Sequence, residues 1–214
     1  MPVFLLDETP LFPPVHLAEP DGLLAVGGDL DTERLLTAYR SGIFPWYDEP
    51  PIAWWCPDPR FVLFPDELRV QKSMRPLLNG QQFRFSVNEN FAAVMSHCGQ
   101  VKRPGQRGTW INPEMIEAYT KLHTAGYAWS AETWQNNRLV GGLYGVWLGR
   151  VFFGESMFAT VANASKYAFI KWVQHLKEKG TVLIDCQVYT DHLAGFGARM
   201  IPRDRFIDYL QQYV

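Results

Sequence analysis

The sequence has few cysteines, and none stands in a pattern that would bind a metal. Cys56, Cys98 and Cys186 are an odd number and form no C-x-x-C pair. Such usage is typical of reduced thiols rather than of disulfides or a zinc site. The histidines also lack the H-E-x-x-H and H-x-x-x-H spacings, and Gly154-Glu155-Ser156 is not the G-x-S-x-G elbow of a hydrolase. The sequence therefore predicts no metal and no covalent intermediate.

Long apolar runs and an excess of positive charge are missing as well. Although 47% of the 214 residues are hydrophobic, no stretch is long enough to span a bilayer, and the N-terminus lacks a basic region followed by a long apolar one. We therefore expect a cytoplasmic protein with no membrane partner. The formal net charge of −2 excludes a generally basic surface for nucleic acid. Any RNA partner must be bound by a local patch, and no DNA partner is expected.

The strongest strand signal covers residues 138–158. Residues 140–148 and 151–158 are rich in β-branched, aromatic and glycine residues, and 148–150 (LGR) is the only plausible reversal between them. This pattern predicts a β-hairpin. Strand alternation places Glu155 on one face with apolar neighbours. Such a carboxylate either lies at a rim or in a salt bridge, or it directs a charge into a pocket.

A helix and a third strand follow the hairpin. Apolar residues recur at helical spacing from Phe169 to Leu176, Asn163 can cap the start, and Gly180 stands just past the end. Residues 181–188 (TVLIDCQV) then form a strand. Alternation places Asp185 and Gln187 on one face, about 7 Å apart along the strand, where they can share a hydrogen-bonded network. Polar groups in an apolar strand are costly unless they are satisfied or used, so a functional and a structural reading both stay open.

The order strand, strand, helix, strand, terminal helix is that of the N-acyltransferase (GNAT) core. Acetyl-CoA enzymes of that superfamily have a glycine-rich turn whose backbone N–H groups hold pyrophosphate at a helix N-terminus. The corresponding residues 159–165 (ATVANAS) contain no glycine. The acyl donor is therefore not expected to be a coenzyme A thioester.

Several motifs together closely resemble the leucyl/phenylalanyl-tRNA-protein transferase family over nearly the whole chain. Their joint occurrence in this order is far more specific than any single motif. The matching stretches are 22–30 (GLLAVGGDL), 42–46 (GIFPW), 54–60 (WWCPDPR), 108–111 (GTWI), 154–158 (GESMF) and 185–188 (DCQV).

The first 69 residues differ in texture from the rest. Asp31 can cap a short helix through Ser41 that Gly42 ends, and prolines and tryptophans then crowd an irregular segment. These aromatics either build a small core or form a stacking wall for the terminal base of single-stranded RNA. The resemblance implies the second role for Trp46 and Trp110. The expected fold is α+β, with a small N-terminal α/β domain (1–69) and a GNAT-like domain (70–214) whose mixed sheet is flanked by helices.

Clustered basic residues lie between positions 70 and 107, including Lys72, Arg75 and the loop 102–107. Basic residues of this kind are usually solvated surface, but an enzyme that holds an RNA end can use them as phosphate contacts. Lys72 and Arg75 are similar to basic positions of the family's tRNA patch, whereas Pro76 replaces another basic residue. The affinity for the acceptor stem is therefore expected to be distributed differently.

The resemblance implies transfer of leucine, phenylalanine or, less well, methionine from aminoacyl-tRNA to the α-amine of proteins that begin with arginine or lysine, which feeds N-end rule degradation. Because the aminoacyl ester is already activated, placement is needed rather than a strong nucleophile, and no cofactor is expected. Asp185 would orient and polarise Gln187, Gln187 would hold the α-amine as it loses its proton, and Glu155 would offer negative charge to cationic groups. Glutamine is a poor base, so positioning and ribose-assisted proton transfer are an alternative.

An apolar set around this centre either forms a pocket for the donor side chain or is simply core. Met157 is the strongest pocket candidate, because a flexible thioether adapts to a branched aliphatic chain and to a flat ring. Two other functions stay open: an acyl-CoA-dependent N-acyltransferase and a tRNA-end binding module without catalysis. The candidate pocket residues are Leu143, Phe153, Met157, Phe169, Trp172 and Ile184.

Overall fold

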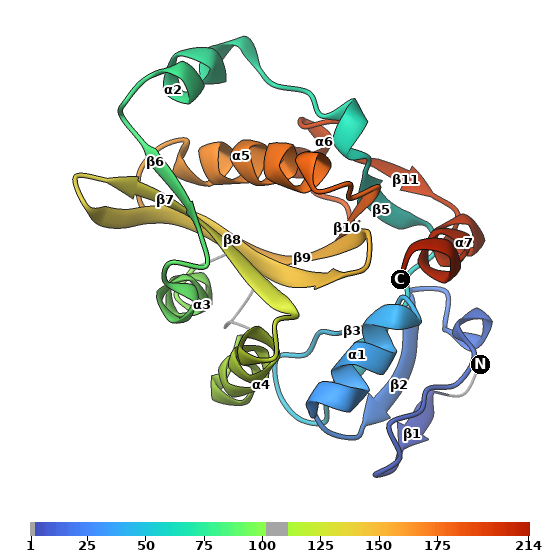
Figure 1. Ribbon diagram of the computed structural model, residues 1–214. Helices are drawn as coiled ribbons and strands as arrows, with labels where there is room; N and C mark the ends of the chain where they lie inside the picture. Colours follow the sequence, from blue (N-terminus) through green and yellow to red (C-terminus); the bar gives the residue numbers. More distant parts are fainter. Residues whose placement is uncertain (1–2, 102–110) are drawn as a thin grey trace.

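The computed structural model describes residues 3–101 and 111–214, and within them two β-sheets lie beside each other (Figure 1). The N-terminal sheet has the order β1-β2-β4-β3, with β1 parallel to β2 and the other pairs antiparallel. Helix α1 follows β2. The bounds are β1 Phe4–Leu6, β2 Leu23–Gly27, α1 Thr32–Arg40, β3 Phe44–Pro45 and β4 Ala53–Trp55.

The second sheet is mixed and has the order β11-β5-β10-β9-β8-β7-β6 among the described residues. Strand β10 runs parallel to β9, and the other neighbours are antiparallel. The strand bounds are β5 Arg60–Leu63, β6 Arg84–Val87, β7 Ala128–Gln135, β8 Arg138–Leu148, β9 Val151–Ala159, β10 Leu183–Gln187 and β11 Arg199–Ile201. The helix bounds are α2 Arg75–Asn79, α3 Phe91–Gly99, α4 Pro113–Thr124, α5 Ala164–Glu178, α6 Asp191–Ala194 and α7 Arg203–Tyr213, and short 3-10 turns cover Val15–Leu17, Pro65–Glu67 and Lys72–Met74.

Helices cover both faces of the mixed sheet. Helix α5 lies on one face, where Trp172 and Ile170 pack with Phe152 in one apolar cluster. Helices α3 and α4 cover the other face, and their cluster continues into α1 and the N-terminal sheet through residues such as Tyr39 and Tyr119. The expected order of strand, strand, helix and strand is present as β8, β9, α5 and β10. The α+β class with a GNAT-like mixed sheet is therefore confirmed.

The local predictions hold with two corrections at helix starts. The hairpin β8–β9 reverses at Gly149 and Arg150, and Gly42 and Gly180 follow α1 and α5 with φ of 76° and 82°. Asp31 and Asn163 occupy the N-cap positions of α1 and α5, but neither side chain makes a capping hydrogen bond. Asn163 instead adopts a left-handed conformation with φ of 66°, which the short polar side chain of asparagine tolerates.

The strand nearest the expected domain boundary belongs to the large sheet. Strand β5 lies before residue 69, yet it pairs with both β10 and β11. This strand therefore brings Arg60 beside the end of β10. No helix among the described residues combines the length and apolar character needed to cross a membrane.

Candidate active site

A cavity of about 480 Å³ opens where β9 and β10 stop pairing. The two strands are paired from Leu183↔Val151 to Asp185↔Phe153, but both continue beyond that point. The cavity is lined by the residues just past it, Gly154 to Met157 on β9 and Cys186 to Val188 on and after β10. This volume lies in the usual range of small-molecule sites. The separated strand ends thus form an apolar pocket with polar groups at one end.

A β-bulge places Glu155 at the polar end of the cavity. On β8 Tyr144 and Gly145 are consecutive, whereas their partners on β9 are Ser156 and Gly154, so Glu155 is the extra residue. Bulges of this kind redirect a side chain and are frequent next to active sites. The bulge also shifts the alternation of every later residue of β9.

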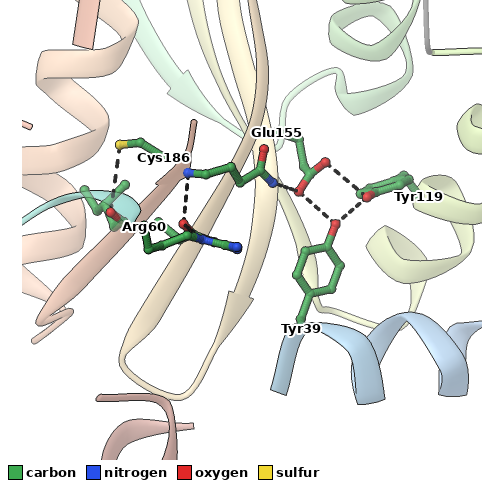
Figure 2. A network of polar contacts seen from close by, with 8 residues as sticks. Tyr39, Arg60, Tyr119, Glu155 and Cys186 are labelled. Carbon is green, nitrogen blue, oxygen red and sulfur yellow. Dashed lines mark hydrogen bonds and ion pairs between the residues drawn. The ribbon is translucent and has the colours of Figure 1, made fainter. Parts of the chain in front are cut away.

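Three donors converge on the half-buried Glu155 carboxyl group. Tyr39 Oη lies 2.8 Å from Oε1, Tyr119 Oη lies 3.1 Å from Oε2, and the Gln187 side-chain amide donates to Oε1 at 2.9 Å. Figure 2 shows Tyr39 and Tyr119 pointing from two helices toward Glu155. Burial in the pocket raises the Glu155 pKa from 4.5 to about 7, and the nearby Asp185 charge adds to this rise, while the three donors oppose it. Burial, together with the Glu155 charge, also raises the pKa of both tyrosines well above 10.

Asp185 is fully buried and paired with Arg60 rather than exposed to the cavity as a free charge. Arg60 Nε and Nη2 donate to the two carboxylate oxygens at 2.8 and 2.6 Å. The guanidinium carbon lies 4.7 Å from the Phe44 ring centroid and 4.6 Å from that of Phe206. Burial is the largest single effect and disfavours the charged guanidinium, but the charge and hydrogen bonds of Asp185, with smaller contributions from Cys56 and Glu155, together raise the Arg60 pKa. The positive charge of Arg60 therefore lies between two aromatic rings and next to the Asp185 carboxylate.

Gln187 reaches Glu155 because its backbone is held in a left-handed turn. Its φ is 63°, and a register shift separates it from Asp185 in the pairing with β5. Its backbone N–H donates to Asp185 Oδ1 at 2.9 Å. Asp185 and Gln187 thus form the expected network, but the contact runs through the backbone, and the side-chain amide is directed to Glu155 instead. The Arg60–Asp185 pair consequently fixes the Gln187 backbone, and the backbone in turn positions the side-chain amide at Glu155.

Four of the six predicted pocket residues line the cavity: Leu143, Met157, Phe169 and Ile184. Phe153 and Trp172 do not, and their assignment is corrected. The bulge at Glu155 puts Phe153 and Met157 on opposite faces of the sheet. Phe153 lies on the face away from the cavity, with its ring centroid 5.1 Å from that of Tyr39. Trp172 is fully buried behind Phe152, with 5.3 Å between the ring centroids, and Phe152 is the aromatic residue that lines the cavity.

The residues assigned to RNA lie in different places. Trp46 lines the cavity and is 37% exposed, with its ring 5.9 Å from that of Trp55. Lys72 and Arg75 are exposed in the 3-10 turn and at the start of α2. Trp110 and the basic loop 102–107 lie outside the described residues.

Sequence reasoning missed the groups that hold the polar end together. Arg60 belongs to the WWCPDPR stretch, and Tyr39 lies on the apolar face of α1, so both were visible in the sequence. The pairing of Arg60 with Asp185 could not be read from the sequence, because the two residues are 125 positions apart. The three cysteines are free and buried, and the described residues include no group of three or more metal-ligating side chains that could hold an ion.

Replacing Arg60 by alanine should lower the free energy of unfolding by about 3–5 kcal/mol, because it leaves the Asp185 carboxylate buried without its partner. Chemical denaturation measures this change. Arg199→Ala is the matched control, since its ion pair with Glu67 is exposed and should contribute less than about 1 kcal/mol. Equally small losses in both variants would show that the buried pair does not hold this part of the fold.

Comparisons with known proteins agree with this architecture. The sequence model of the family described as leucyl/phenylalanyl-tRNA protein transferase matches residues 62–211, and that of its N-terminal domain matches residues 28–58. The solved structure of FemX superposes with a TM-score of 0.52 at 10% identity, covering 80% of this chain and 66% of that one, which shows the fold alone.

Curated relatives extend the match to nearly the whole chain. A leucyl/phenylalanyl-tRNA–protein transferase of Anaeromyxobacter sp. (strain K) is 56% identical over 97% of this chain and 89% of its own length. One of Flavobacterium johnsoniae is 55% identical over 98% of this chain and 99% of its own length. The chain therefore belongs to the leucyl/phenylalanyl-tRNA-protein transferase family of aminoacyltransferases.

Proposed function

We propose that this enzyme transfers leucine, phenylalanine and, less well, methionine from aminoacyl-tRNA to the α-amine of proteins with N-terminal arginine or lysine. The observation that carries the proposal is the cavity between β9 and β10, which is apolar along most of its wall and ends at the hydrogen-bonded Glu155 and Gln187 side chains. The apolar wall would thus surround the side chain of the transferred amino acid, and the polar end would lie beside its ester carbonyl. The names of the relatives specify leucyl and phenylalanyl donors.

The apolar wall suits the proposed donors. Met157 and Leu143 are cross-strand neighbours, and Phe152, Phe169 and Ile184 complete the wall from β9, α5 and β10. A flexible thioether beside aromatic rings can adapt to a branched aliphatic chain and to a flat ring. Hydrophobic pockets discriminate by only about 1–3 kcal/mol per methylene, so a graded preference among leucine, phenylalanine and methionine is expected.

The polar end suits a cationic acceptor. Two carboxylates line the cavity, Glu155 and Asp185. Arg60 neutralises the charge of Asp185, whereas no ion pair joins Glu155 to a cationic side chain among the described residues. In this proposal Glu155 attracts the cationic groups at the acceptor's N-terminus. Gln187 holds the α-amine beside the ester carbonyl, and Asp185 orients Gln187 through its backbone N–H.

The 3′ end of the tRNA would enter over Trp46, whose exposed ring at the cavity can stack on a terminal base. Trp110 is proposed to share this role on the grounds of resemblance alone. Lys72 and Arg75 would contact phosphates, with Pro76 in place of a further basic residue. No cofactor is required, because the aminoacyl ester supplies the activated carbonyl. Such substrates would place the reaction in the cytoplasm, where it would feed N-end rule degradation.

The test mixes the enzyme with phenylalanyl-tRNA carrying labelled phenylalanine and a peptide that begins with arginine. Appearance of the label in the peptide, and its absence from a peptide that begins with glycine, is the expected result. Binding of the charged tRNA without transfer would favour a tRNA-end binding module. Acetylation of the peptide from acetyl-CoA would favour a coenzyme A-dependent N-acyltransferase.

Gln187→Ala should slow peptide transfer by roughly 100-fold, because the α-amine loses a positioning donor, while binding of charged tRNA changes little. Asp185→Ala should act in the same direction. Single-turnover transfer and filter binding measure the two effects. Gln211→Ala removes an exposed glutamine of α7 and serves as the control. Wild-type turnover in both Asp185→Ala and Gln187→Ala would refute the proposed centre.

Met157→Trp should reduce the rate of phenylalanine transfer more than that of leucine transfer, because the added indole fills the space that the larger phenyl ring needs. Initial rates with tRNAs charged with each amino acid provide the comparison, and valine and isoleucine should be rejected by wild type. Met200→Trp, at an exposed methionine of β11, is the control. Equal loss for both donors together with a lowered Tm would assign Met157 to the core rather than to the pocket.

A further inference from the structure

Glu155, Tyr39 and Tyr119 form a closed ring of hydrogen-bond contacts. Tyr39 contacts carboxyl oxygen Oε1, Tyr119 contacts Oε2, and the two phenol oxygens contact each other. Both tyrosines are fully buried, and they come from α1 of the N-terminal part and from α4. Glu155 also lines the cavity, so the ring lies beside it. Figure 2 shows the three side chains and the contacts that join them.

The number of available hydrogens decides in which protonation state of Glu155 all three contacts of the ring are hydrogen bonds. Three contacts require three hydrogens, whereas two tyrosine hydroxyls supply only two. A protonated Glu155 supplies the third. Oε1 already accepts from Tyr39 and from Gln187, so the proton belongs on Oε2, which then donates to Tyr119 while Tyr119 donates to Tyr39. When Glu155 is ionised, both hydroxyls turn to the carboxylate and no hydrogen remains between the two phenol oxygens.

We propose that Glu155 accepts the proton released by the acceptor's α-ammonium group, and that Tyr39 and Tyr119 are positioning residues that keep its carboxyl group hydrogen-bonded in both the ionised and the protonated state. The inference rests on the proposed function, because it assigns a role to Glu155 toward the amine of that same reaction. It differs from a purely attractive role, in which Glu155 would keep its charge throughout.

The proton balance of the step is complete. The ammonium group gives one proton to the Glu155 carboxylate, which leaves a neutral amine with its lone pair free to attack the ester carbonyl. As the C–O bond to the 3′ oxygen breaks and the C–N bond forms, a second proton passes from the nitrogen to the leaving 3′ oxygen. The products are an amide and a free 3′ hydroxyl group. Glu155 then releases its proton to water and returns to the ionised state.

The surroundings of Glu155 bring its proton affinity close to that of the amine. Tyr39 and Tyr119 face it from α1 and α4, Gln187 and the Asp185–Arg60 pair from β10 and β5, and Tyr47 lies near Tyr119. Burial and Asp185 raise the Glu155 pKa to about 7. The α-amine of a peptide has a pKa of roughly 8, and proton transfer is most efficient between groups of similar pKa.

The ring is tested in the free enzyme by carbon NMR of carboxyl-labelled glutamate, with Glu155→Gln to identify the Glu155 signal. Wild type should titrate with a midpoint of about 7. Tyr39→Phe and Tyr119→Phe should raise the midpoint by roughly one pH unit, because each removes a hydroxyl that donates more strongly to the ionised carboxylate than to the neutral group. Tyr167→Phe, which removes a buried hydroxyl bonded to the Phe83 carbonyl, should leave it unchanged. A midpoint near 4, or one that both ring variants leave unmoved, overturns the ring.

The catalytic half is tested by the pH profile of kcat/KM for the arginine peptide. Activity should fall as the pH drops through about 7, because protonated Glu155 accepts no proton, and this acidic limb should move upward in the two ring variants. Glu155→Gln should lower kcat/KM and leave only the limb set by the peptide's own amine, at roughly pH 8. If the enzyme transfers phenylalanine but the acidic limb of the pH profile stays at the same pH in all variants, the inference is overturned and the proposed function is still supported. Absence of transfer in wild type at every pH would overturn both, whatever the NMR titration shows. Circular dichroism and Tm show whether each variant is folded.

Discussion

The buried ion pair between Arg60 and Asp185 is the contact on which the geometry of the site depends. Arg60 comes from β5, and its guanidinium lies between Phe44 of the N-terminal sheet and Phe206 of α7. Asp185 ends the part of β10 that pairs with β9. One interaction therefore joins the N-terminal part, the mixed sheet and the last helix beside the cavity. Removing either partner alone leaves a buried charge, so this junction tolerates few alternatives.

Two departures from regular strand geometry convert this junction into a site. The bulge in β9 directs Glu155 toward the two tyrosines, and the left-handed turn at Gln187 directs its amide back to Glu155. Neither residue is glycine, so the turn at Gln187 is held by its surroundings, notably by the Asp185 carboxylate that accepts its backbone N–H. The wall of the cavity is apolar, and hydrogen-bonding groups are concentrated where the reacting amine and ester would meet.

The sequence predicted those parts of the fold that follow from local pattern. The hairpin, helix α5 and strand β10 were readable from residue spacing, and Asp185, Gln187 and Glu155 do form one hydrogen-bonded network. Two pocket residues, Phe153 and Trp172, were misplaced. For Phe153, strict alternation fails across the bulge, and no residue type announces that bulge. Trp172 lies on α5 behind Phe152, and helical spacing does not show which residue of such a packed pair lines the cavity. Arg60, Tyr39 and Tyr119 were missed as site residues because their partners are distant in sequence and only the tertiary fold brings them together.

The most direct test of the account is a crystal structure with a non-hydrolysable analogue in which phenylalanine is linked to 3′-amino-adenosine by an amide. The account predicts that the phenyl ring lies among Leu143, Met157 and Phe169, with the carbonyl carbon beside Gln187 and Glu155 and the adenine on Trp46. A phenyl ring bound outside this cavity, or a carbonyl directed away from Glu155 and Gln187, would contradict the assignment of the site.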